Sequence, residues 1–390
     1  MSPPSMLRVP SYLPRVRVIW QSGIGVSIAI SLLLGGALPS LCAADPNAPL
    51  ASLAASVTPP TTSAASPLSV SPATVAVPES TPVTPFEQNL QRIFADDQEA
   101  DIRVIFGYDN SADIRHVNDP FRAEHFMEYL KKAGFCPAQV TEAERQRLGV
   151  TDEAQNLRLF DGLGVQGHKL RLSMIWSART TSFARNIGSE YLQQVKCSEQ
   201  ALKFMQKAAT DAEVMIYVGH SREGGGPDTF PPEIKYSGGE YLHRVDFAPY
   251  RENRPGLVSL APYLSKATSK PHIISWTSCK SDTHFQGWFR KTLAQKEQDT
   301  SLVMSTRFTT FHPWIAEIQD NDEGLMATVC LIDALRYNPS QAAFERRLNT
   351  TCEIESERIS GKPAWRVSSV PGNGGAKTAP SAAGSAVAGQ

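Results

Sequence analysis

The chain has 390 residues, of which 41% are hydrophobic and 20% charged, and 38 basic against 39 acidic side chains leave a net charge of -1. This balance gives no electrostatic reason for binding nucleic acid, and the sequence has no basic block in which arginines alternate with aromatic residues. The length exceeds that of one typical domain, but the composition of both ends predicts a single folded unit between them.

The amino-terminal residues 1–44 have the pattern of a secretory signal peptide. Arg8, Arg15 and Arg17 precede an apolar segment over 24–38, and small residues follow at 43–44. A basic start, a short apolar core and a small-residue cleavage site are typical of export signals. We therefore expect cleavage near residue 44 and a secreted or periplasmic protein with no other membrane association. An uncleaved amino-terminal membrane anchor is the alternative.

Two segments flank the expected domain and have little apolar character. Residues 45–85 consist almost wholly of Ala, Pro, Ser, Thr and Val, and residues 368–390 are rich in Gly, Ala and Ser. Such segments cannot bury enough apolar surface to offset the entropy lost on ordering. We expect a disordered linker over 45–85, a folded domain over 86–367 and a disordered tail over 368–390.

Inside the domain, short apolar runs alternate with segments of helical periodicity. The runs predict strands and the periodic segments predict helices. A long stretch rich in Gly and Pro over 224–270 interrupts this alternation as an excursion from the end of a strand. The alternation predicts an α/β fold with a mostly parallel sheet covered by helices on both faces. In chain order, we expect strand 102–106, helix 121–133, strand 170–176, helix 198–208, strand 214–218, strand 273–276, helix 282–293 with Asp282 as its N-cap, strand 302–306, helix 323–337 and helix 339–348 with Asn338 as its N-cap.

Chemically reactive side chains follow two of these strands. Gly219, His220 and Ser221 come after the strand at 214–218, while Ser278 and Cys279 come after the strand at 273–276. Ligands of open α/β sheets bind outside such carboxyl ends. A thiolate beside an imidazolium is a strong nucleophile, so the pattern favours Cys279 as nucleophile and His220 as general acid and base. Oxyanion donors would be the backbone N–H of Cys279 and one from the turn at 219–222.

The order of these segments resembles the caspase-like cysteine peptidases, the group containing caspases, legumain and the gingipains. In that family a strand ends in a His-Gly pair, and a later parallel strand ends in a small residue followed by the nucleophilic Cys. The resemblance implies a caspase-like three-layer sandwich over 101–348, with His220 and Cys279 as the dyad and Ser278 as the small residue. It implies cleavage of amide bonds in a peptide or protein substrate through a thioacyl-enzyme. The chain departs from the family at Ser221, where the family usually has Gly.

The excursion supplies two candidate substrate-binding residues, Arg222 and Asp228. In the caspase-like interpretation, Asp228 would face a basic side chain of the substrate. The alternative is an Asp that forms a turn after Gly-Pro. His116 and Asp109, which follow the first strand, would border the same cleft.

Two other functions remain open. An exported binding or scaffold protein could use the same cleft without turnover, with Ser221 as the sign of lost catalysis. A serine esterase could use Ser221, but Glu223 replaces the second glycine of the Gly-x-Ser-x-Gly elbow and the following Gly-Pro run opposes a helix there.

The remaining features predict no metal or cofactor. His272, His284 and His312 lack the spacing of a zinc site. Asn349 begins a glycosylation sequon. If Cys42 is removed with the signal peptide, Cys279 can remain a free thiol while the other four pair, although the sequence does not determine a pairing. Those four are Cys136, Cys197, Cys330 and Cys352. The oligomeric state is also open.

Overall fold

The computed structural model describes residues 82–95, 99–110, 116–151, 153–164, 167–237, 242–267, 269–309, 311, 322–351 and 363–373. The expected signal peptide, nearly all of the expected linker, most of the expected tail, His312 and Cys352 lie outside these residues. Among the described helices, none has the length and apolar character that a membrane span requires.

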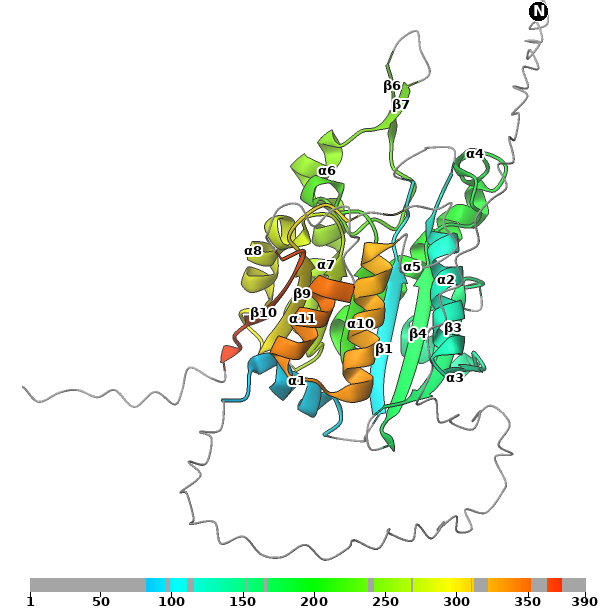
Figure 1. The fold of residues 1–390 in the computed structure, drawn as a ribbon. Helices are drawn as coiled ribbons and strands as arrows, with labels where there is room; N and C mark the ends of the chain where they lie inside the picture. The colour runs from blue at the N-terminus through cyan, green and yellow to red at the C-terminus, as the bar shows by residue number, and fades with distance from the viewer. Residues whose placement is uncertain are drawn as a thin grey trace, which may run out of the picture. The chain divides into compact units, whose positions relative to one another are not determined.

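An eight-stranded sheet forms the centre of the described part of the chain, in the order β10-β9-β8-β5-β1-β4-β3-β2 (Figure 1). The neighbours β4, β1, β5, β8 and β9 all run parallel. The outer pairs β9–β10, β4–β3 and β3–β2 are antiparallel. The expected mostly parallel sheet is therefore confirmed. Its strands are β1 Glu99–Phe106, β2 Cys136–Ala138, β3 Leu157–Leu163, β4 Lys169–Trp176, β5 Val214–Val218, β8 Ile273–Thr277, β9 Thr300–Ser305 and β10 Trp365–Val370.

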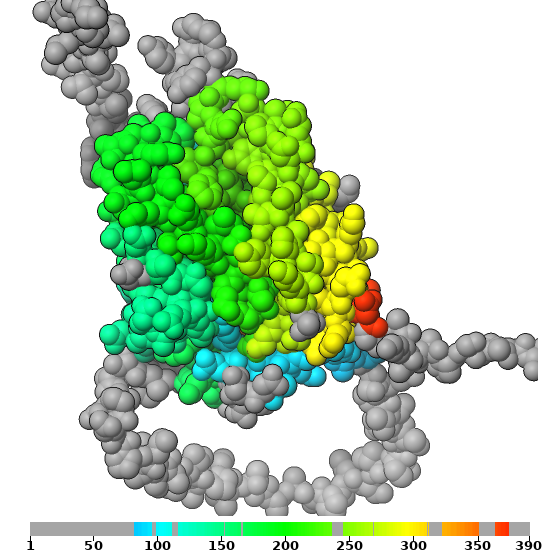
Figure 2. Space-filling view, turned by 180° about the vertical axis from the view of Figure 1, so that it is seen from behind, coloured from blue at the N-terminus to red at the C-terminus, as the bar shows by residue number. Residues whose placement is uncertain are grey.

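Helices cover both faces of this sheet. One face packs against α1 (Pro85–Ile93), α2 (Asp119–Lys132), α10 (Glu323–Tyr337) and α11 (Gln341–Thr351), which Figure 1 shows in front of the strands. The other face packs against α3 (Glu142–Leu148), α5 (Tyr191–Asp211), α7 (Pro255–Lys266) and α8 (Ser281–Leu293), and Figure 2 shows the molecule from that side. The α/β class with helices on both faces is thus as expected.

Short elements occupy the loops at the carboxyl ends of the parallel strands. They are α4 (Phe183–Asn186), the 3-10 turn η3 (Arg222–Gly224), α6 (Ala248–Asn253) and a separate antiparallel pair of strands, β6 (Ile234–Ser237) and β7 (Leu242–Val245). Most of them belong to the excursion between β5 and β8. These elements were not predicted, because the Gly- and Pro-rich composition of the excursion is typical of irregular loops. Helix α7, in the same excursion, was not predicted either.

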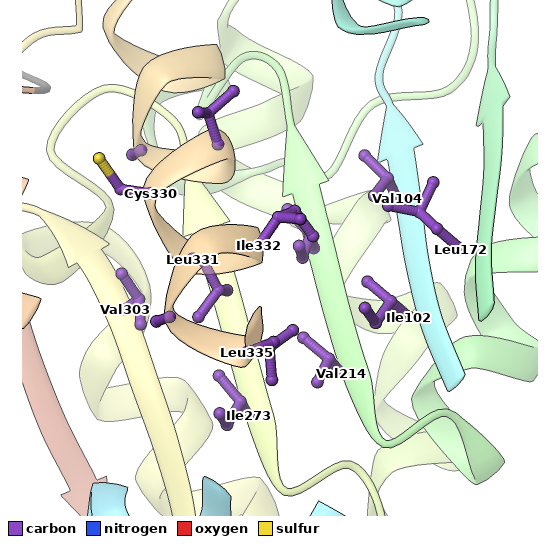
Figure 3. Close-up of a cluster of buried hydrophobic side chains, with 14 of the residues drawn as sticks. Ile102, Val104, Leu172, Val214, Ile273, Val303, Cys330, Leu331, Ile332 and Leu335 are labelled. Atoms are coloured by element: carbon purple, nitrogen blue, oxygen red, sulfur yellow. The ribbon is translucent and has the colours of Figure 1, made fainter. Parts of the chain in front are cut away.

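The core in front of the sheet depends on α10, which is buried along nearly its whole length. Leu331 and Leu335 point from this helix toward strand residues that include Val214 and Ile273 (Figure 3). The central strands β5, β8 and β9 are buried at every position. Unbroken apolar runs are typical of strands covered on both sides, which is why these strands could be predicted.

Behind the sheet, an aromatic cluster joins β8 to α8. The ring centroid of Trp276 lies 5.7 Å from that of Phe285 and 5.1 Å from that of Phe289. Tyr217 on β5 packs against the same indole at 4.8 Å. Aromatic pairs at these separations stabilise a core beyond simple area burial. The cluster therefore fixes the start of α8, which immediately follows Cys279.

Two expected helix caps were wrong. Lys280, at φ 49°, takes the N-cap position of α8, and Asp282 lies inside the first turn, where its carboxylate accepts a hydrogen bond from Arg366. Asn338, at φ 45°, closes the carboxyl end of α10 because a left-handed Asn is a common helix terminator. The backbone N–H of Ala343 binds the hydroxyl of Ser340, so Ser340 serves the start of α11.

The folded unit extends past its expected end. Strand β10 runs to Val370 and pairs residue for residue with β9 along Thr300–Ser305. Asn349 contributes to this edge, since its side chain accepts a hydrogen bond from the Trp365 N–H and donates to the Trp365 carbonyl. The sequon asparagine is therefore a structural bridge between α11 and β10.

The cysteines differ in part from the permitted pairing. Cys136 and Cys330 are disulfide-bonded. Cys197 is a free, buried thiol on α5, where it packs as a small apolar residue. Cys279 is free and partly exposed, as expected.

Candidate functional site

The strands that carry His220 and Cys279 are direct neighbours. Parallel β5 and β8 pair Val218 with Thr277 at their carboxyl ends. Gly219 continues this pairing, because its N–H donates to the Thr277 carbonyl at 3.4 Å. His220 and Cys279 each lie two residues beyond the Val218–Thr277 pair, so the register brings them to the same level of one edge of the sheet.

A carboxylate from a third strand contacts the imidazole. Asp109 follows β1, the other neighbour of β5, and its Oδ1 lies 2.8 Å from His220 Nε2. The Asp109 side chain is only 3% exposed, whereas that of His220 is 19% exposed. This distance is that of an ion pair when the imidazole is protonated, but His220 Nε2 makes no hydrogen bond to the described residues. The imidazole therefore has a buried anionic side and a side open toward the edge of the sheet.

Asp109 is held by a buried arginine on α2. Arg122 Nη1 donates to Asp109 Oδ2 at 3.1 Å, and its Nε and Nη2 each lie 2.6 Å from one oxygen of Asp322. Asp119, also on α2, accepts a hydrogen bond from the Asp109 N–H at 3.3 Å, and burial raises the pKa of Asp119 to about 8. At this pKa most of the Asp119 carboxyl is protonated at neutral pH, so it adds little charge to this network.

Cys279 occupies the turn between β8 and α8. Its Sγ lies 3.4 Å from the hydroxyl and 3.8 Å from the carbonyl oxygen of Thr309, which follows β9. The backbone N–H of Cys279 has no acceptor within the described part of the chain, so it can donate to a bound oxyanion. The start of α8 lies directly after this residue, and the positive end of a helix favours negative charge.

The small residues beside the pair have structural reasons for their size. A Cβ on Gly219 would lie 2.6 Å from the Tyr217 hydroxyl, which donates a hydrogen bond to the His220 carbonyl at 3.1 Å. Ser278 is fully buried, and its hydroxyl has no hydrogen-bond partner among the described residues. Gly219 therefore leaves room for the hydroxyl that holds the backbone of His220.

Ser221 does not occupy a nucleophile elbow. It is 7% exposed, and its carbonyl accepts hydrogen bonds from the N–H groups of Gly224 and Gly226. The chain continues into the short η3 turn rather than into an α-helix. An elbow presents its serine on a strand-to-helix turn, so this geometry does not suit Ser221 as a nucleophile.

Arg222 and Asp228 form a buried ion pair instead of facing a substrate. Arg222 Nε donates to Asp228 Oδ2 at 2.8 Å, and the two side chains are 2% and 6% exposed. Arg222 also donates to the carbonyl of Tyr108 and to Oδ1 of Asn110, while Tyr250 donates to Asp228. Charges buried at this depth are paired with one another, which differs from the expected role in substrate binding. The pair holds the residues on either side of Asp109.

The histidines outside the dyad do not assemble a site. No group of three or more potential ligands is present in the described part of the chain. His272 is buried below β8, and burial lowers its pKa to about 4. Burial also lowers the pKa of His284, while His116 forms a backbone bridge with Ser182. Neither His272 nor His284 adds a ligand cluster to the edge that carries Cys279.

Sequence reasoning expected Asp109 to border the cleft but did not anticipate the side chains that hold it. Arg122 and Asp322 are separated by 200 residues, and neither stands in a motif. Arg122 follows an Asp and a Pro at the start of a helix, and Asp322 occupies the N-cap of another helix. Charged residues at helix starts are usually exposed, so only the strand order could have suggested that these two meet.

Comparison of the chain with known protein families, curated proteins and solved structures found no match.

Proposed function

We propose that the protein is an exported, caspase-like cysteine hydrolase that cleaves amide bonds in peptides or proteins. The observation that carries this proposal is the shared register of β5 and β8, which delivers His220 and Cys279 to one edge of the sheet. The caspase-like assignment is supported by the order of the two parallel strands, each followed by a small residue and a reactive side chain. Export is supported by the signal-like pattern of residues 1–44.

The proposed chemistry divides among three side chains. Asp109 holds the imidazole at Nε2, which leaves Nδ1 of His220 to accept the proton of the Cys279 thiol. The sulfur then adds to the substrate carbonyl carbon, and the Cys279 N–H donates to the oxyanion that forms. His220 returns the proton to the departing amine, so that the C–N bond breaks and a thioester remains. Water, deprotonated by His220, then releases the acid product and the thiol.

A second candidate function is a binding protein with the same fold and no turnover. The contact of Cys279 Sγ with Thr309 favours it, because a thiol hydrogen-bonded to a threonine is not directed at a base. Ser221 in place of the family glycine is also consistent with lost catalysis. Such a protein would hold an extended peptide at the edge of the sheet through the same exposed groups.

Alkylation and peptide hydrolysis distinguish the two. We expect iodoacetamide to modify Cys279 with one label per chain and to abolish cleavage of a mixed peptide library, followed by mass spectrometry. Cys279→Ala and His220→Ala should each eliminate cleavage, and Asp109→Asn should reduce it by about 10²-fold to 10⁴-fold, as for other groups that assist proton transfer. Buried Cys197 provides the internal control for unspecific labelling.

Retention of cleavage by Cys279→Ala would refute the hydrolase mechanism. Peptide binding by both wild type and Cys279→Ala, without cleavage by either, would instead establish the binding protein. Labelling of Ser221 by a fluorophosphonate, with Cys279 untouched, would establish the serine esterase.

A further inference from the structure

Arg122 connects two buried carboxylates that come from opposite ends of the domain sequence. It makes a bidentate pair with Asp322, at 2.6 Å for each contact, and a single bond of 3.1 Å with Asp109. All three side chains are nearly excluded from water, at 6% exposure for Arg122, 3% for Asp109 and 0% for Asp322. Burying three charges is costly, so the arrangement calls for a function beyond holding two helices together.

The two oxygens of Asp109 contact different residues. Oδ2 accepts from Arg122, while Oδ1 lies against the imidazole of His220. Rotation of the carboxylate away from His220 would break the bond to Arg122. The guanidinium is itself fixed, because its two bonds to Asp322 define both its position and its plane.

Asp322 is anchored in turn by secondary structure. Its Oδ1 accepts the N–H of Leu325 and thereby caps α10, and its backbone forms a β-bridge with Phe311. The guanidinium of Arg122 lies 5.2 Å from the centre of the Phe311 ring. The start of α10 and the end of β1 are therefore connected to the imidazole by a continuous chain of charged contacts.

We propose that Arg122 and Asp322 are positioning residues that act on His220 through Asp109 and set the pH range in which Cys279 reacts. This inference rests on the proposed dyad of His220 and Cys279. Neither Arg122 nor Asp322 touches the reacting atoms. Their effect is exerted through the orientation and the charge of the Asp109 carboxylate.

The charges around the imidazole determine whether a variant raises or lowers the pH at which Cys279 reacts. Arg122, Asp322 and Asp109 sum to one negative charge beside His220. Among other groups at this edge, Asp119 is mostly protonated at a pKa of about 8, and the pairs Arg222–Asp228 and Arg307–Glu323 are each neutral. Lys280, which follows Cys279, adds a positive charge that is the same in every variant, and its ammonium lies 4.2 Å from the centre of the Phe308 ring. This excess negative charge lies on the Asp109 side of the imidazole, so a variant that changes the sum changes the electrostatic potential at the dyad.

Removing Arg122 and removing Asp322 should shift the midpoint pH of Cys279 alkylation in opposite directions. Arg122→Met leaves two uncompensated carboxylates, whose negative charge opposes formation of the Cys279 thiolate. Asp322→Asn removes one of those negative charges and keeps an oxygen for the helix cap. At an effective dielectric constant of about 20, a unit charge at roughly 8 Å to 10 Å moves a titration by about one pH unit.

The test measures the rate of Cys279 alkylation by iodoacetamide between pH 4 and pH 9, which requires no substrate. We expect the midpoint of Arg122→Met to move up by about one pH unit and that of Asp322→Asn to move down by a similar amount. The double variant should return toward the wild type. Arg122→Lys keeps the charge but loses the bidentate geometry, so its midpoint should stay near that of the wild type while its rate falls.

Controls separate this charge effect from a general loss of structure. Glu128→Gln removes an exposed charge of α2 that pairs with Lys131, and it should leave the midpoint unchanged. Circular dichroism and the labelling of Cys197 report unfolding in each variant. Should Arg122→Met fail to fold, the midpoint of Asp322→Asn still decides the question.

Equal midpoints for the wild type and the charge-changing variants Arg122→Met and Asp322→Asn, with only the rate reduced, would overturn the inference and leave Arg122 a structural residue. Failure of the proposed function gives a different result. In that case wild-type Cys279 would alkylate with the pH dependence of an isolated thiol, and His220→Ala would not change it.

Discussion

Replacing Lys296 by Met should stabilise the protein at neutral pH. Lys296 lies between α8 and β9 with 1% exposure, and its ammonium donates to the Pro271 carbonyl at 2.7 Å and to the Thr300 hydroxyl at 3.0 Å. Burial lowers the pKa of Lys296 to about 7 from an ordinary value of 10.5. Folding therefore disfavours the charged form of Lys296, which lowers the free energy of unfolding wherever the unfolded chain is charged at this residue.

The size of the effect follows from this pKa. The difference from 10.5 to about 7, at about 1.4 kcal/mol per unit, corresponds to about 5 kcal/mol of lost stability at low pH. At pH 7 the loss is a little smaller, about 4 kcal/mol, because half of the folded molecules hold Lys296 neutral there. The Thr300 hydroxyl also donates to the Pro271 carbonyl at 3.2 Å, so both groups keep a partner when the ammonium is removed. We therefore expect Lys296→Met to raise the free energy of unfolding by roughly 3 kcal/mol at pH 7.

The pH dependence supplies the check. Because the folded pKa is depressed, the unfolded chain binds more protons between about pH 7 and pH 10.5, and the wild-type penalty shrinks as pH rises through this window. Urea unfolding at pH 7 and pH 10 should show the gain falling to about 1 kcal/mol or less. Lys291→Met, on the exposed face of α8, is the matched control and should be neutral at both values. A gain that does not change with pH, or a loss at pH 7, would refute the reasoning.

Three further substitutions test other parts of the structure. Gly219→Ala places a Cβ 2.6 Å from the Tyr217 hydroxyl, so urea unfolding should show a loss of about 1–3 kcal/mol and alkylation of the site cysteine should slow. Asp228→Asn leaves the buried Arg222 without its carboxylate, and we expect a loss of about 3–5 kcal/mol, measured as a lower Tm and urea midpoint. Asn349→Ala removes the side-chain hydrogen bonds between α11 and β10, which should cost about 2–3 kcal/mol in urea unfolding and leave cysteine alkylation unchanged.

Much of the sheet could be predicted because its central strands are buried on both faces. The runs at Val214–Val218 and Ile273–Thr277 contain few polar residues and end at Gly or Ser, which defines each strand locally. The outer strands β2, β3 and β10 were missed because β2 is only three residues long and contains a Pro, and because β3 and β10 include polar residues that resemble those of loops. Helix α7 was missed because its Pro and Gly residues resemble an irregular excursion.

The position of the candidate residues along the strands could be predicted for the same reason. Strand ends are visible in the sequence, and the pairing of β5 with β8 brings the ends that carry His220 and Cys279 to one edge of the sheet. The functions of Arg222 and Asp228 could not be read, because a charge in a loop gives no local sign of whether water or another side chain faces it. Their spacing across a Gly-Pro turn was the one available signal of a mutual pair.

The three groups of the proposed site arrive from three adjacent strands, with the imidazole on the middle one. A newly made chain therefore carries no nucleophile of special reactivity, since its sulfur, imidazole and carboxylate remain scattered until β1, β5 and β8 have paired. A hydrolase built this way would become able to damage other proteins only after its own folding is complete.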